Sequence, residues 1–251
     1  MDDLIPQLDL KAVQRAFDSA SHRYDEHAVL QHEVASRLLS RLSYLKIKPG
    51  LILDIGAGTG RPTHELMKRY PAAKILALDL SLRMLKVARK RGRVFRRPAV
   101  VCAHAQQLPL ADASVDMVFS SLSLQWCDHP QEAFSEIHRV LKPDGVVLFS
   151  TFGPDTLKEL RSSWSAVDSE EHVHGFMDMH DVGDVMVQAG LQEPVMEREV
   201  ITLTYDHVRD VMRDLRYIGA SNALYNRSRG LMGKDKFKLY CRCRQLCLFS
   251  G

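Results

Sequence analysis

No apolar run in this chain of 251 residues approaches 18 residues, so the sequence predicts no membrane-spanning helix. A strong charge of one sign is also missing. The 34 Lys and Arg residues and 31 Asp and Glu residues give a net charge of +3, too mild to indicate nucleic acid by itself. The opening MDDLIPQLDL shows neither a secretory signal nor an Arg-rich transit pattern. We therefore expect a cytoplasmic protein with no nucleic-acid or membrane partner.

Cysteine is scarce, and its spacing does not indicate a metal site. Three of the five cysteines crowd into CRCRQLC, residues 241–247, where the C-x-C-x3-C spacing matches no usual zinc or redox motif. Cys102 and Cys127 stand in apolar surroundings, typical of reduced thiols in or near a core. Internal repeats and low-complexity segments are absent as well. We expect one domain and no metal.

Buried strands alternate with helices through the first half of the chain. The pattern predicts helices over 64–70, 82–91 and 130–142, and strands over 51–55, 74–80, 99–103, 115–120 and 145–151. Strands separated by helices form βαβ units that cross over right-handedly into a parallel sheet. We expect an α/β fold with its ligand beyond the carboxyl ends of the strands, at the switch point of the topology.

Helical segments outside this alternation are candidates for a lid over the strand ends. Residues 194–205 are predicted to form a sixth strand, and 206–220 a further helix. The expected single domain therefore has five parts: an N-terminal helical lid (1–45), a cofactor-binding core (46–152), a helical cap insertion (153–192), a sixth strand with a docking helix (193–238) and an atypical tail (239–251).

The glycine loop GAGTG, residues 56–60, follows the first strand. It lacks the Lys and hydroxyl of a P-loop, and its G-x-G-x-G spacing differs by one residue from the dinucleotide fingerprint. Asp54 at its mouth would repel a pyrophosphate but attract a cation. A nucleoside with a positive group fits, and S-adenosylmethionine is one. A tight turn with no ligand remains the alternative.

Asp79 favours the nucleoside. It ends the second strand, where a ribose-binding acid is expected, and its carboxylate can accept from both ribose hydroxyls. The alternative role, capping the next helix, is weakened because Ser81 is available for it.

Several segments together resemble class I S-adenosylmethionine-dependent methyltransferases. They include LDIGAGTG, LDLSLRML and AHAQQLPLADASVDMVFSSLSLQW. More narrowly, FDSASHRYDEHAVLQ, STFGPDTLKELRSSW, FMDMHDVGD and MRDLRYIGASN resemble the malonyl-[acyl-carrier protein] O-methyltransferases of biotin synthesis, over nearly all of residues 12–238. The chain is also similar to an assembly factor that hydroxylates arginine on the same fold.

The resemblance implies a Rossmann-like sheet with helices on both faces and a helical lid. It implies methyl transfer from S-adenosylmethionine to the free carboxylate of malonyl on acyl carrier protein. Tyr24 is the implied catalytic hydroxyl, with lid packing as its alternative, and Trp126 walls the substrate tunnel unless it is plain core. His27 and Gln31 close over the cofactor from the lid. The implied cofactor-binding residues are Asp54, Gly56, Gly58, Gly60, Asp79, Leu80, His104, Gln106, Ser120 and Gln31.

Two positions depart from the family pattern. His104 stands where an acid commonly accepts from the adenine amine; a neutral imidazole can accept one hydrogen bond, and Gln106 can substitute. HVHG, residues 172–175, replaces the usual His-x-Asn-Arg, so a carboxylate-binding cation is missing and His172 or His174 must donate instead. A metal site built from these two and His180 lacks a supporting acid or thiol pattern.

Carrier protein is acidic, and Arg209, Arg213 and Arg216 share one face of their predicted helix. We expect Arg213 and Arg216 to bind it, although neighbouring aspartates dilute the charge. The basic run 83–97 is more typical of a solvated helix face.

Two other functions remain open: a methyltransferase for a free small molecule, such as a quinone precursor or organic acid, and a hydroxylating assembly factor. The end of the chain also departs from the family. Relatives continue past GLMGKDKFK with a helix and an aromatic strand, whereas this sequence has LYCRCRQLCLFSG. We expect the terminal antiparallel strand to be missing, the tail thiols to be reactive and the fold to be less stable.

Overall fold

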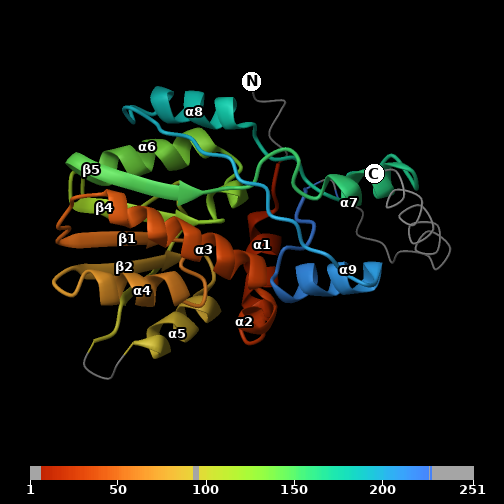
Figure 1. The fold of residues 1–251 in the computed structure, drawn as a ribbon, viewed down its shortest axis with the longest axis horizontal. Helices are drawn as coiled ribbons and strands as arrows, with labels where there is room; N and C mark the ends of the chain where they lie inside the picture. The colour runs from red at the N-terminus through yellow and green to blue at the C-terminus, as the bar shows by residue number, and fades with distance from the viewer. Residues whose placement is uncertain (1–6, 93–95, 226, 228–251) are drawn as a thin grey trace.

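The computed structural model describes residues 7–92, 96–225 and 227. Within them lies a sheet of five parallel strands in the order β3-β2-β1-β4-β5, which confirms the predicted fold class (Figure 1). The strands are β1 (Leu51–Ile55), β2 (Lys74–Asp79), β3 (Ala99–Cys102), β4 (Val115–Ser121) and β5 (Leu141–Ser150). The chain order reverses between β1 and β4, so the carboxyl ends of these two strands flank the expected ligand position.

Strand β5 begins at Leu141, four residues earlier than the sequence predicts. Leu141 pairs with Val115, but the next pair joins Val146 to Met117, so the register shifts over the Pro-Asp-Gly turn. Asp144 within that turn has a φ of 63°. The structure therefore contains the predicted Pro-Asp-Gly turn, but the turn lies within β5 and does not precede it.

Helices cover both faces of the sheet because alternate side chains of β1 and β4 point to opposite sides. Leu53, Ile55 and Val118 pack toward α6 (Pro130–Val140) and α8 (Met179–Gln188). Ile52 packs with Phe119 toward α4 on the other face. Each fully buried aliphatic side chain contributes roughly 1.5–3 kcal/mol. The elements on this second face are α3 (Val29–Arg41), the short helix η2 (Leu42–Tyr44), α4 (Arg61–Arg69) and α5 (Leu82–Arg91).

Segments from distant parts of the chain meet beyond the strand ends, on the right of Figure 1. They are α1 (Leu10–Ala20), α2 (Tyr24–His27), η3 (Leu124–Trp126), α7 (Lys158–Ser165) and α9 (Val208–Tyr217). An isolated antiparallel bridge joins Leu8 to Leu224, and the Asp9 amide donates to the carbonyl of Ala223 over 2.8 Å. The cover over the site is thus built from both halves of the sequence.

The predicted sixth strand is wrong for the described structure. Residues 194–205 run beside β5 in an irregular conformation and pair with no strand. Ion pairs hold this run to α3: Arg37 contacts Glu199 over 2.9 Å, and Arg41 contacts Glu197 over 2.6 Å. Alternation of apolar residues makes a strand only where a neighbouring strand supplies hydrogen-bond partners, and here β5 pairs with no residue of this run.

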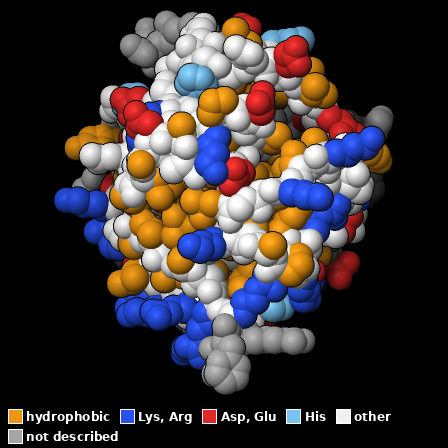
Figure 2. Space-filling model, turned by 90° about the vertical axis from the view of Figure 1, so that its left-hand side faces the viewer, with side chains coloured by type: hydrophobic (Ala, Val, Ile, Leu, Met, Phe, Trp, Pro, Cys, Tyr) orange, Lys and Arg blue, Asp and Glu red, His pale blue; other side chains and the backbone are white. Residues whose placement is uncertain are grey.

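A long apolar groove separates β5 from this run. Val146 and Leu148 of β5, Leu38 of α3 and Val200 of the irregular run line it. The groove reaches the end of the sheet where the strands begin, at Leu45 and other lining residues; Figure 2 shows hydrophobic side chains gathered there among Lys and Arg. We name it the β5 groove.

The atypical tail over 239–251 lies outside the described residues. The predictions of reactive tail cysteines and of a missing terminal strand fall in that part of the chain as well. Within the described part of the chain, every helix is too short or too polar to cross a membrane.

Candidate active site

The three loop glycines all have positive φ, at 69°, 55° and 80°, but they meet different surroundings. A Cβ on Gly56 would lie 1.9 Å from Ser123 Oγ, and one on Gly60 would lie 2.6 Å from the Cβ of Ala88 in α5. A Cβ on Gly58 would meet nothing within 4 Å. Gly56 and Gly60 therefore permit close packing of the protein on itself, whereas Gly58 opens onto space that a ligand can fill.

Asp79 faces this opening. Its Oδ2 accepts from the Gly58 amide over 2.8 Å, and its Oδ1 accepts from the Ser81 amide over 2.7 Å. The Ser81 hydroxyl accepts from the Met84 amide at the start of α5, so Ser81 is the cap, as predicted. Burial raises the pKa of the Asp79 carboxyl to about 6, against the lowering effect of the two amide hydrogen bonds. Leu80 follows it, with its carbonyl bound by Gln14.

Asp54, at the same edge, is a second acid and is fully buried. It is 1% exposed and accepts from the Thr63 hydroxyl over 2.5 Å. Burial raises the pKa of Asp54 to about 7, and the charge of Asp79 adds to the rise. The charge of Asp79 acts on the buried Asp54, and a positive charge beside the pair would relieve the cost of ionising both carboxyl groups.

His104 and Gln106 lie beyond the end of β3. The Gln106 amide donates to Nδ1 of His104 over 3.3 Å, which leaves the proton of the neutral ring on Nε2. The Gln106 side-chain nitrogen donates to Glu132 over 2.7 Å, and its Oε1 is buried with no partner. Burial lowers the pKa of His104. From the sequence, we expect His104 to accept a hydrogen bond from the adenine amine. In the structure the Nε2 of His104 is a donor, and Gln106 presents the acceptor instead.

Other unpartnered polar atoms lie near the strand ends. Ser120, the residue before the last of β4, is fully buried, and its Oγ has no hydrogen-bond partner; Oδ1 of Asp128 is buried and unpartnered too. A buried polar atom without a partner costs about 1–3 kcal/mol, which a bound ligand can recover. Asp128 is not identified from the sequence, because its position directly after LQWC is the only sequence feature that distinguishes it from other acids. These atoms, with the space at Gly58, fit a nucleoside that carries hydroxyl and amine groups.

The lid helix α2 is joined to both sides of this site. Asp25 accepts from the Thr59 hydroxyl over 2.7 Å and pairs with Arg91 of α5. His27 Nδ1 lies 2.9 Å from Asp214 of α9, and its ring packs 4.4 Å from that of Tyr217. The lid therefore spans from the glycine loop to α9.

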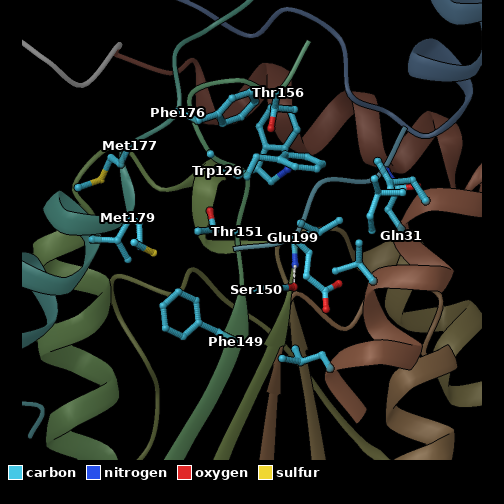
Figure 3. Close-up of a pocket in the computed structure, with 18 of the residues that line it drawn as sticks. Gln31, Trp126, Phe149, Ser150, Thr151, Thr156, Phe176, Met177, Met179 and Glu199 are labelled. Atoms are coloured by element: carbon cyan, nitrogen blue, oxygen red, sulfur yellow. Dashed lines mark hydrogen bonds between the residues drawn. The ribbon is translucent and has the colours of Figure 1, made fainter. Parts of the chain in front are cut away.

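Tyr24 begins this lid helix. Burial and the nearby charges of Asp79 and Asp25 raise its pKa, so the phenol keeps its proton. Gln31, one turn into α3, lines the β5 groove instead (Figure 3).

Trp126 forms part of an aromatic wall. Its ring meets Phe17 edge-on at 5.4 Å and His174 at 5.2 Å, and His174 meets Phe176 at 4.7 Å. Figure 3 shows Trp126, Phe176 and Thr151 around one cavity near the end of β5. Trp126 thus lines a cavity while packing against α1.

The other predicted substrate residues, His172, Arg213 and Arg216, also line the β5 groove. His172 Nε2 is 2.8 Å from Asp168, and its ring stacks on Trp164 at 3.9 Å, so this nitrogen is already bonded. Arg213 pairs with Asp210 over 2.8 Å on α9, and both Arg213 and Arg216 are exposed. His172, His174 and His180 do not come together; the metal-capable group in the described chain is Asp168, Glu170 and His172.

Residues 53–149 match the family model described as a methyltransferase domain. A malonyl-[acyl-carrier protein] O-methyltransferase of Gallionella capsiferriformans (strain ES-2) is 48% identical over 233 residues, 90% of this chain and 80% of the relative. One of Halorhodospira halophila (strain DSM 244 / SL1) is 49% identical over 229 residues, 91% of this chain and 78% of the relative.

A solved structure shares the fold. Phosphoethanolamine N-methyltransferase 2 of Haemonchus contortus, in complex with S-adenosyl-L-methionine, is 25% identical with a TM-score of 0.52. The match covers 62% of this chain and 36% of that one. The nucleoside that the site fits is therefore of the kind a structural neighbour binds.

Proposed function

Because this chain belongs to the malonyl-[acyl-carrier protein] O-methyltransferase family, we propose that it methylates the free carboxylate of malonyl on acyl carrier protein, with S-adenosylmethionine as methyl donor. The methyl ester hides the carboxylate, so that the acyl chain can be extended as a fatty-acid primer on the way to biotin. The observation that carries the proposal is the opening at Gly58 beside the partly buried Asp79, with an aromatic-walled cavity at the ends of the adjacent strands.

The chain's residues would hold the donor by complementary chemistry. Asp79 accepts from the ribose hydroxyls, and the charge of Asp54 favours the positive end of the ligand. Gln106 Oε1 accepts from the adenine amine, and His104 donates to a ring nitrogen. When bound, S-adenosylmethionine supplies a methyl group on a positive sulfur that an oxygen nucleophile displaces, which gives a methyl ester and a neutral thioether.

The acceptor needs no general base, since a carboxylate is already a nucleophile. Alignment of the reacting groups can supply roughly 7–11 kcal/mol of the rate enhancement. The wall of Trp126 and Phe176 gives the cavity an apolar side, and the protonated phenol of Tyr24 is a donor for the carboxylate or its neighbour. A neutral donor is sufficient, because the carboxylate loses its charge as the ester forms.

The decisive experiment supplies labelled S-adenosylmethionine with malonyl-carrier protein, malonyl-CoA, free malonate or acetyl-carrier protein. We expect a base-labile methyl ester on malonyl-carrier protein and none on acetyl-carrier protein, which has no free carboxylate. Equal labelling of free organic acids would favour a small-molecule methyltransferase. No methyl ester on any acid would contradict the proposal and leave the hydroxylating assembly factor as the better account.

A further inference from the structure

His174 is a buried imidazole with a free nitrogen in the wall of the cavity. It lies in the segment between α7 and α8 and is 8% exposed. Trp126 and Phe176 flank its ring, and its Nε2 is buried without a hydrogen-bond partner. It lines the β5 groove and also a small neighbouring cavity that Thr151 and Gln125 share.

The residues around His174 do not explain why a polar ring stands here. The wall continues through aromatic contacts, Phe17 to Trp126 and Phe152 to Phe176. Thr151 and Gln125, polar groups of the small cavity, are hydrogen-bonded to each other over 3.5 Å. A phenyl ring at position 174 would keep the packing and avoid the cost of an unpartnered nitrogen. The unpartnered nitrogen therefore indicates that this position binds a polar ligand.

The protein keeps this ring neutral and fixed. Burial and, to a smaller extent, the positive charge of Arg161 lower the pKa of His174 to about 4. Arg161 donates to the carbonyls of Pro154 over 3.1 Å, Thr156 over 3.2 Å and His174 itself over 3.5 Å. It thereby ties the turn after β5 to the segment that carries His174. A neutral imidazole offers one donor and one acceptor nitrogen.

We propose that Nε2–H of His174 donates a hydrogen bond to the free carboxylate of the acyl substrate and holds it for methyl transfer. The inference rests on the proposed function and adds the residue that selects the substrate's free end. A carboxylate that leaves water for an apolar cavity needs a donor. In methyl transfer this carboxylate loses its charge, so a full cation beside it would stabilise the starting state more than the transition state. A neutral donor positions the carboxylate with less of this penalty.

The test measures binding of malonyl-carrier protein and acetyl-carrier protein to enzyme saturated with S-adenosylhomocysteine. The two ligands differ in the free carboxylate. We expect His174→Phe to weaken malonyl-carrier protein by about 10- to 100-fold, the range for a hydrogen bond to a charged group, and to leave acetyl-carrier protein unchanged. His174→Gln, which keeps a donor, should recover part of the loss. His180→Gln, at an exposed imidazole on α8, is the matched control and should change neither ligand.

A second measurement needs no substitution. In the ¹⁵N-histidine-labelled native chain, malonyl-carrier protein should shift one imidazole Nε2–H signal that acetyl-carrier protein leaves in place, and the signal that is missing in His174→Gln identifies it. Equal losses for both ligands in His174→Phe, or no selective shift, would show that His174 only packs the wall. If the native enzyme binds both ligands equally and forms no ester, the proposed function itself fails.

Discussion

Asp54 is a buried acid and Asp79 a partly buried one, and their pKa values, about 7 and about 6, lie well above those of exposed carboxyls. As pH falls from 8 to 5.5, the empty site takes up protons that a cationic ligand must displace. Affinity for S-adenosylmethionine should therefore fall. The stability of the empty protein should instead rise as pH falls over this range. The two carboxyls have higher pKa values in the folded state than in the unfolded state, so proton uptake favours the folded form.

Calorimetry and thermal unfolding at both pH values check the two directions. Asp54→Asn, which can still accept from the Thr63 hydroxyl, should flatten both profiles. The ligand's own titration cancels when this variant is compared with the native chain. A profile that the substitution leaves unchanged would mean that Asp54 does not titrate with binding.

Asp79→Asn should weaken S-adenosylhomocysteine binding by roughly 1–3 kcal/mol, because an amide oxygen accepts more weakly than a carboxylate and its nitrogen cannot accept. Asp116→Asn is the matched control. Asp116 accepts from the Gly50 and Leu51 amides at the opposite end of the sheet, as Asp79 does from Gly58 and Ser81. The control should lower the melting temperature but not the affinity, and equal affinities for all three proteins would remove Asp79 from the site.

The sequence predicts which acids stand at strand ends better than it predicts how polar side chains in the site are oriented. Asp79 follows from its place after an apolar run, and the Ser81 cap follows from local chemistry. The acceptor of Gln106 depends on Glu132, 26 residues away, and the surroundings of the His174 ring depend on Trp126, 48 residues earlier in the chain. Such roles depend on long-range packing, which no local pattern encodes.

At the scale of elements, α9 connects the lid with a basic surface. Its Asp214 and Tyr217 contact His27, while Arg213 and Arg216 are exposed. Reversing both arginines to Glu should raise KM for malonyl-carrier protein several-fold and leave S-adenosylhomocysteine affinity unchanged, because acidic carrier protein would then be repelled.

The matched control reverses Arg89 and Lys90, two exposed cations at the end of α5, and so makes the same change in net charge at another surface. KM should stay near the native value in this control. If both double variants raise KM equally, overall charge rather than α9 attracts the carrier.

Element boundaries show why one prediction failed. The limits of β1 agree with the sequence because β2 pairs with it along its whole length and β4 pairs with it from Ile52 onward. Residues 194–205 carry a comparable apolar pattern but lie along the β5 groove, where pairing is missing. A strand depends on its neighbour as much as on its own residues.

At the scale of the whole molecule, β5 is an edge strand: the described residues supply it with a partner on the β4 side alone. Its outer backbone faces the β5 groove, and the neighbouring run exposes Val195 at 94% and Val200 at 78%. An edge with free N–H groups and apolar flanks is a template for pairing with another chain.

We therefore predict faster amide exchange in β5 than in β1, which is paired on both sides, and association that grows with protein concentration. Mass-spectrometric exchange and light scattering measure the two effects. Val195→Lys with Val200→Lys should reduce association, because charge beside an edge opposes pairing, whereas Lys in place of Val187, exposed on α8, should have less effect. Exchange in β5 as slow as in β1, with no association, would show that a segment outside the described residues already completes the sheet.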